Sequence, residues 1–287
     1  MLKVKTWMFY SYKGGSGRTV ATANVAAALT KLGKRVAVVD LDFEAPGLQH
    51  VFGAEDTDQY ANGVGIQQYL LGERDFEELN SLGTIDMFGP HGPLRGNYVP
   101  KDALLLYVIA SPGVSALSDR AREVSPKMRA LLDELGSKHN LDVVIIDAAS
   151  GLRTAFEVAI NVSDEMLIFF RWSTQHVEGT IKVAKLMKMM REFQTGRPIP
   201  FKLVASAVPE IEDIKKEPES ISAPLLQRIG ETHEKISKTL KDCQANPAEV
   251  FHKIDEKLAL KWREKVIVFE QEDSDYEQLA KKLIASL

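Results

Sequence analysis

A glycine-rich loop near the N-terminus carries residue types that bind phosphate. Residues 12–19 read Tyr-Lys-Gly-Gly-Ser-Gly-Arg-Thr, and three glycines in four positions allow the backbone to curl so that successive N–H groups point inward. Arg18 can place a cation against phosphate oxygens, and Thr19 can offer its hydroxyl to Mg²⁺. The spacing predicts a phosphate cradle, with a flexible glycine turn as the alternative. The expected binding residues are Lys13, Gly14, Gly15, Ser16, Gly17, Arg18, Thr19 and Val20.

Carboxylates follow two apolar runs further along the chain. Asp40 and Asp42 are separated by one residue at the end of the first run, so on a strand both point to the same side. One can orient water and the other can serve a metal ion. Asp147 follows four aliphatic residues and has the form of a Walker B aspartate, which would hold a water of the Mg²⁺ shell. The alternative is that these are solvated carboxylates at strand ends.

Strands and helices must position these residues. Apolar runs alternate with helical patterns, which predicts an α/β fold: a mostly parallel, twisted sheet of about seven or eight strands with helices on both faces. Ligands bind such sheets beyond the carboxyl ends of the strands, which places Asp40 and Asp42 beside the glycine loop. Strands are expected at Thr6–Ser11, Arg35–Leu41, Ala103–Ala110, Asp142–Ala148, Glu165–Phe170, Phe201–Val208 and Val266–Phe269.

A charged segment with two prolines interrupts this alternation after residue 210. Two helical patterns follow, at Ala223–Cys243 and Pro247–Arg263. We therefore expect a single domain over residues 1–287, with a helical insert at 211–263 before the last strand.

Composition excludes several classes of protein. The 287 residues include 36 basic and 40 acidic ones, and the net charge of −4 argues against nucleic-acid binding by bulk charge. Cys243 is the single cysteine and is expected to be inert, so disulfides within the chain and cysteine-ligated iron–sulfur or zinc sites are excluded. The chain lacks a signal-peptide pattern and an apolar run long enough to span a membrane, and a cytoplasmic location is expected.

The loop, in its strand-to-helix context and with the carboxylates in this order, resembles the deviant Walker A ATPases of the MinD/ParA family. The family motif KGGxGK followed by Thr or Ser appears here as KGGSGRT. The resemblance implies ATP and Mg²⁺ as cofactors and an ATP-dependent homodimer in which Lys13 reaches the partner's nucleotide. It makes Lys13 and Asp42 the catalytic residues, Asp42 positioning the attacking water, and Thr19, Asp40 and Asp147 the metal-site residues.

Two residues depart from the usual Walker A pattern. Tyr12 stands at the first glycine position and Arg18 at the lysine position. A guanidinium is larger and planar and prefers two-point contacts, so nucleotide binding could persist while hydrolysis slows. The alternative function is a nucleotide-binding regulatory module with little or no ATPase activity, in a signalling or defence assembly. A guanine-recognition motif is absent at the sixth strand, which favours ATP over GTP, and how the base would bind near Ala205–Ala207 stays open.

The resemblance implies that ATP binding and slow hydrolysis act as a dimerisation switch that controls a partner protein or a surface. A protein partner, held by the helical insert, is one expectation. Basic residues at three-residue spacing, Lys182, Lys185, Lys188 and Arg191, could meet DNA phosphates or form a solvated helix face. The C-terminal segment from Tyr276 to Leu287 carries an apolar face that could lie on a membrane but is expected to pack on the sheet as the last helix. His176 could line a dimer interface or be a loop histidine.

Overall fold

The computed structural model describes residues 4–110, 120–192, 199–208, 211–242, 250–256, 260 and 263–287. Its central feature is an eight-stranded sheet in the order β3-β4-β2-β5-β1-β6-β7-β8. Every pair of neighbouring strands is parallel except β3 and β4, which are antiparallel. The strands are β1 Lys5–Tyr10, β2 Arg35–Leu41, β3 Thr84–Asp86, β4 Leu104–Val108, β5 Val143–Ala148, β6 Glu165–Phe170, β7 Phe201–Val208 and β8 His252–Asp255.

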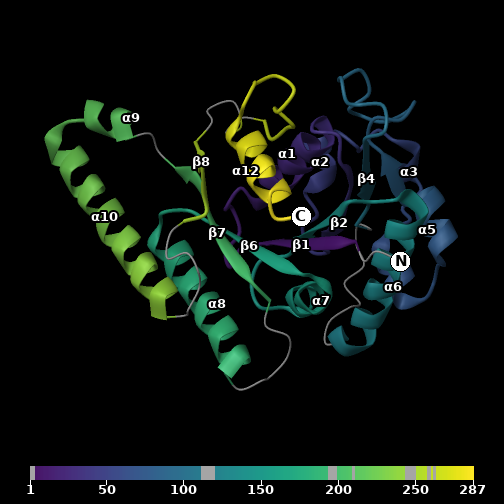
Figure 1. Cartoon of the computed structure of the whole chain (residues 1–287), viewed down its shortest axis with the longest axis horizontal. Coiled ribbons are helices and arrows are strands. Elements are labelled where there is room, and N and C mark those ends of the chain that lie inside the picture. Colours follow the sequence, from purple (N-terminus) through teal and green to yellow (C-terminus); the bar gives the residue numbers. More distant parts are fainter. Residues whose placement is uncertain are drawn as a thin grey trace.

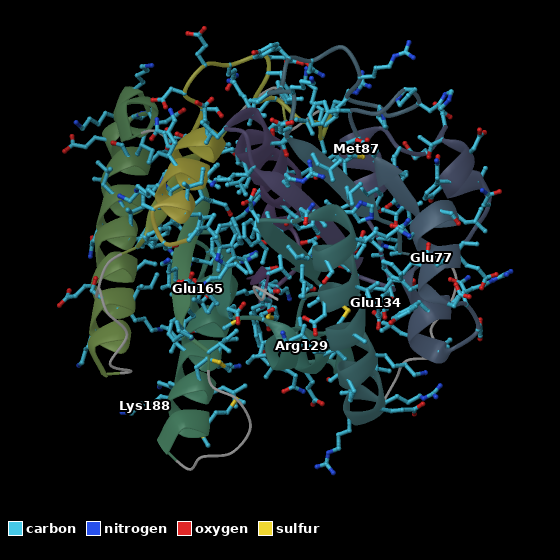
Figure 2. The ribbon with its side chains drawn as sticks, turned by 45° about the vertical axis from the view of Figure 1, so that its right-hand side comes forward. Glu77, Met87, Arg129, Glu134, Glu165 and Lys188 are labelled. Carbon is cyan, nitrogen blue, oxygen red and sulfur yellow. The ribbon has the colours of Figure 1, made fainter. Side chains whose placement is uncertain are left out.

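Helices cover both faces of the sheet (Figure 1). On one face, α1 packs over β1, β2 and β5, and α2 and α12 pack against α1. On the other face, α6 and α7 pack over β5, α8 packs over β6, and α4 packs against α6. Arg129 on α6 donates a hydrogen bond of 3.1 Å to the carbonyl of Asn161 on α7, and joins these two helices (Figure 2). The helices are α1 Arg18–Lys31, α2 Leu48–Phe52, α3 Asp58–Ala61, α4 Ile66–Leu71, α5 Phe76–Leu82, α6 Ala121–His139, α7 Thr154–Val162, α8 Thr174–Glu192, α9 Ile211–Lys216, α10 Glu219–Asp242 and α12 Asp275–Ile284.

The sheet is built as the apolar runs predict. The strands of its centre are buried on both sides, as strands between two helical layers must be, and six of the seven predicted strands are present with small shifts of their ends. The predicted α/β fold with helices on both faces is confirmed.

The C-terminal third requires two corrections. The predicted strand Val266–Phe269 is irregular chain and turn, while β8 lies inside the segment predicted as a helix at Pro247–Arg263. β8 pairs with β7 and is the last strand among the described residues, and α9 and α10 lie between these two strands along the chain. Residues 243–249, 257–259 and 261–262 of the predicted insert, including Cys243, lie outside the described residues.

A side chain of α1 provides hydrogen-bond partners to the backbone of the segment after residue 263, as a neighbouring strand would do. Asn24 is fully buried, and its Oδ1 accepts a hydrogen bond of 2.7 Å from the backbone N–H of Ile267. Its Nδ2 donates a hydrogen bond of 3.0 Å to the carbonyl oxygen of Lys265. These bonds satisfy backbone groups that a strand would have paired in a ladder, so the apolar run can lie against α1 without joining the sheet.

α12 buries its apolar face inside the protein. Leu279 and Leu283 are fully buried, and the helix packs mainly against α1. The prediction that this segment is the last helix of the fold is confirmed, and those apolar side chains are not available to a membrane. None of the described helices combines the length and the apolar character needed to cross a membrane.

Candidate functional site

The glycine loop joins the central strand β1 to α1. Gly15 and Gly17 have φ angles of +75° and +77°, which side chains other than glycine adopt only with strain. α1 begins directly afterwards at Arg18, and its N-cap residue, Gly17, has no side chain that could cap the helix. The N–H groups that follow Arg18 in this first turn and the positive end of the helix dipole therefore face the loop, which is the arrangement that binds phosphate.

Ser206, near the end of β7, holds the loop from the side. Its hydroxyl donates to the backbone carbonyl of Ser16, and both side chains are buried. The Ser16 hydroxyl in turn accepts a hydrogen bond of 3.3 Å from the backbone N–H of Arg18. The loop is therefore pinned in its curled form by a residue 190 positions away in the sequence.

The side chain of Arg18 connects the predicted catalytic and metal-site residues. Its Nε donates 2.6 Å to Oδ1 of Asp147, and its Nη2 lies 3.1 Å from Oδ2 of Asp42 and 3.3 Å from Oγ1 of Thr19. Thr19 also donates 2.9 Å to Oδ2 of Asp147, and Thr22 donates 3.1 Å to Oδ1. Thr19, Asp42 and Asp147 thus come together around the guanidinium of Arg18. The sequence motif predicts instead that this guanidinium points toward phosphate.

Asp40 lies directly behind this group and is completely buried. One carboxyl oxygen accepts a hydrogen bond of 2.9 Å from the backbone N–H of Asp42, and the other has no partner in the described structure. Burial and the nearby charge of Asp147 raise the pKa of Asp40 well above its usual range. An unpartnered buried oxygen at this position is the kind of group that an ordered water or the shell of a bound cation satisfies.

A cavity of about 370 Å³ opens above the loop. It is lined by loop residues 14–20, by Asp42 and Glu44 after β2, and by Ser150 and Arg153 after β5. Arg153 pairs with Glu44 across its edge, and both side chains are more than half exposed. Among the described residues no three Asp, Glu, His or Cys side chains gather in a group that could hold a metal ion.

A second cavity of about 100 Å³ adjoins the first at Gly17 and Val20. It lies at the carboxyl ends of β6, β7 and β8 and is lined by Arg171, Ser206, Ala207, Asp255, Glu256 and Tyr276. Glu264 lines both cavities. Sequence reasoning left base recognition open near Ala205–Ala207 and did not identify the other residues, because the strand β8 that brings Asp255 here was predicted as part of a helix.

Tyr12 explains how the loop tolerates the loss of its first glycine. A Cβ atom added at Gly179 of α8 would lie 2.1 Å from Cδ1 of Tyr12, so the tyrosine ring rests directly on the backbone of that helix. The Nζ atom of Lys182 lies 5.8 Å from the centre of the same ring. The bulk at position 12 is therefore accommodated by a glycine on α8, a contact that no local sequence pattern predicts.

His176 lies in the first turn of α8 and is buried, so the alternative of a loop histidine is wrong. Burial and the charges of Arg171 and Lys13 lower the pKa of His176 below its usual value. The Lys13 side chain itself is exposed, at the rim of the loop.

The basic residues of α8 differ in how far they are exposed to solvent. Lys182 and Lys185 are exposed and Lys188 is half-buried; Figure 2 shows Lys188 in the lower part of this helix. Ala184 and Met187, opposite them, are buried, as the helical spacing predicts. α10 packs along α8, where Arg228 donates to the hydroxyl of Thr174 and Lys235 lies 3.7 Å from Glu178. The side chain of Arg191 lies outside the described residues.

Comparison with known proteins agrees with this geometry. The family model described as "CobQ/CobB/MinD/ParA nucleotide binding domain" matches residues 7–269. An uncharacterized ATP-binding protein of Methanocaldococcus jannaschii is 27% identical over 181 residues, which cover 63% of this chain and 58% of the relative. The chain spans about half to three-fifths of the length of the curated relatives that it matches first.

Solved structures share the fold across the whole chain. The MinD cell division protein of Aquifex aeolicus is 20% identical with a TM-score of 0.65 and covers 98% of both chains. The septum site-determining protein MinD of Pyrococcus horikoshii, complexed with Mg-ADP, is 16% identical with a TM-score of 0.61, covering 98% of this chain and 96% of its own. With the loop, the carboxylates and the family model in agreement, this chain belongs to the CobQ/CobB/MinD/ParA family of nucleotide-binding domains, as a member of its MinD/ParA-like P-loop group.

Proposed function

We propose that the chain binds ATP with Mg²⁺ in the larger cavity and uses the nucleotide as a dimerisation switch with slow hydrolysis. The observation that carries this proposal is the convergence of the curled loop, the uncapped start of α1 and the Thr19–Asp147 pair at one end of the sheet. Amides, a helix dipole and an oxygen pair are the complementary partners of a triphosphate and its magnesium ion.

The donor set fits this ligand. Thr19 and Asp147 offer oxygens that Mg²⁺ prefers, and the unpartnered oxygen of Asp40 lies behind them for a water of the metal shell. Bound Mg²⁺ would supply neutralisation of phosphate charge during transfer. Asp42, at the carboxyl end of β2 and lining the cavity, is the residue we assign to orienting the attacking water, as the resemblance implies.

The smaller cavity is the proposed site of the base. It adjoins the phosphate loop at Gly17, and its polar lining of Ser206, Asp255 and Glu256 could accept or donate hydrogen bonds to a purine. Glu264 lies where the two cavities meet, between the expected positions of phosphate and base, and is suited to accept hydrogen bonds from ribose hydroxyls.

Lys13 supports the dimer part of the proposal. It lies on the same side as the cavity and its side chain is exposed in the single chain, which leaves it free to reach a second molecule. The relatives include a MinC:MinD complex of Aquifex aeolicus, so a protein partner is a reasonable target. DNA contact through Lys182 and Lys185 is a further candidate, whereas the buried face of α12 disfavours membrane binding.

A second candidate function is a nucleotide-binding module with little or no hydrolysis. The ion pairs of Arg18 with Asp42 and Asp147 favour it, because they engage the residue expected to orient water. Single-turnover measurement of phosphate release separates the two: retained ATP with no phosphate release would select the module.

Sizing chromatography with no nucleotide, ADP, ATP and a non-hydrolysable analogue tests the switch. We expect dimers only with ATP or the analogue, loss of the dimer in Lys13→Ala, and a longer-lived dimer in Asp42→Ala. Lys101→Ala and Asp56→Ala, exposed residues away from the cavity, are the matched controls and should behave like the wild type. A mass that does not respond to nucleotide would remove the switch, and calorimetry without heat of ATP binding at millimolar Mg²⁺ would remove the binding site itself.

A further inference from the structure

The Arg18 side chain takes the position of a cation among the metal-site groups. Only 7% of its side chain is exposed, and Asp147, its partner at 2.6 Å, is completely buried. Its fork-shaped guanidinium bridges two carboxylates and a hydroxyl, a pattern that a lysine ammonium cannot reproduce with the same spread of donors.

The oxygens that would serve a metal are already satisfied by this arrangement. Oδ1 of Asp147 accepts from Arg18 and Thr22, and Oδ2 accepts from Thr19. The hydroxyl of Thr19 is thereby used twice, as a donor to Asp147 and as an acceptor from Arg18. A divalent cation could not share these groups with a guanidinium, because the two positive charges would lie within a few ångströms of each other in a buried site.

Removing Arg18 from the site would leave a buried charge without a partner. Asp147 lies in the centre of the sheet, where an uncompensated carboxylate is costly. A cation must therefore accompany it in both the free and the loaded protein. In the free protein that cation is supplied by the chain.

We propose that Arg18 is an internal counter-ion that holds the metal site before ligand arrives, and that Mg²⁺ entering with the nucleotide replaces it. The guanidinium then turns from the carboxylates to the phosphates, and the same movement releases Asp42. This inference rests on the proposed function for its ligand. It makes Arg18 a positioning residue that keeps Asp42 engaged until nucleotide and metal are both present, so that metal binds poorly without nucleotide.

Binding of Mn²⁺ without nucleotide, measured by electron paramagnetic resonance, tests the exchange directly. We expect weak binding by the wild type and at least tenfold tighter binding by Arg18→Gln, because the carboxylates lose their resident cation. Arg18→Lys, which keeps the charge but cannot bridge both carboxylates, should lie between them. Arg74→Gln removes an exposed arginine away from the cavity, with the same change of charge, and should leave Mn²⁺ binding at the wild-type value.

Equal Mn²⁺ affinity of the wild type and Arg18→Gln would overturn the proposal, as would tight Mn²⁺ binding by the wild type. Should Arg18→Gln not fold, as judged by circular dichroism, the comparison of Arg18→Lys with the wild type decides in the same way. Calorimetry of ATP binding by the wild type keeps the two proposals distinct: a failure there removes the proposed function, whereas the Mn²⁺ titration contains no nucleotide and tests Arg18 alone.

Discussion

Replacing Gly179 by alanine should distort the phosphate loop through Tyr12. The new Cβ would lie 2.1 Å from Cδ1, 2.6 Å from Cγ and 2.9 Å from Cβ of that residue. Such contacts force either the α8 backbone or the tyrosine to move. Because Tyr12 immediately precedes Lys13, movement of the ring displaces the start of the loop, and we expect weaker ATP binding as well as lower stability.

The sign of the stability change separates this contact from ordinary helix propensity. Glycine to alanine inside a helix normally stabilises by about 0.5–1 kcal/mol. Forcing an atom into a filled space costs about 1–3 kcal/mol. We therefore expect Gly179→Ala to lose about 1–2 kcal/mol, which corresponds to a fall in Tm of about 2–6 °C. Gly230 of α10, where an added Cβ meets no atom within 4 Å, is the matched control and should gain stability on the same change.

Urea denaturation of a double-mutant cycle gives the decisive measurement. Tyr12→Gly restores glycine at the first loop position and removes the ring, so Gly179→Ala should cost little or nothing in that background. The expected coupling is about 1 kcal/mol or more. Additive changes, or a Gly179→Ala protein as stable as Gly230→Ala, would refute the contact between the loop and α8.

Three further predictions concern other parts of the molecule. Gly17→Ala should weaken ATP affinity while costing about 1–2 kcal/mol, because position 17 requires a positive φ; calorimetry and thermal unfolding measure the two effects. Asn24→Ala should cost about 1–3 kcal/mol by leaving the backbone of Lys265 and Ile267 unpaired, and limited proteolysis should then cleave near residue 265 first, whereas Asn62→Ala on the surface should not. Burial is the first cause that lowers the pKa of His139, His176 and His252 in the folded protein, so below pH 6.5 the unfolded chain binds more protons than the folded one. The free energy of unfolding should therefore fall as the pH drops from 6.5. Urea midpoints measured between pH 7.5 and 5 should show this fall, and it should be smaller in His176→Gln.

The centre of the fold could be predicted because its signals are local. Buried parallel strands appear as apolar runs, and the loop between β1 and α1 is defined by contiguous residues. The edges could not: β3 has three residues, and β8 has one fully apolar inward residue, Ile254, in a segment whose charges suit a helix. The run Val266–Phe269 has the composition of a strand, but the backbone N–H of Ile267 donates to the side chain of Asn24 and not to a neighbouring strand. No local pattern reveals this partner, which lies 243 positions away in the sequence.

The site divides in the same way. Thr19, Asp42 and Asp147 can be expected to lie close together, because ligands bind parallel sheets at the carboxyl ends of the strands. The direction in which the Arg18 side chain points cannot be predicted in this way, because phosphate and the two carboxylates compete for it in three dimensions. The roles of Ser206 and Gly179 likewise arise from contacts between distant segments. For these residues the type alone, a serine near a strand end or a glycine in a helix, carries no specific signal.

The order of strands has a consequence during synthesis on the ribosome. β1 is complete by Tyr10, but its two neighbours begin only at Val143 and Glu165, so this central strand waits unpaired while more than half of the protein is made. At ordinary translation rates that interval is on the order of ten seconds. The nascent chain must be shielded from aggregation throughout, and the curled loop cannot be held by Ser206 until at least 206 of the 287 residues have been made.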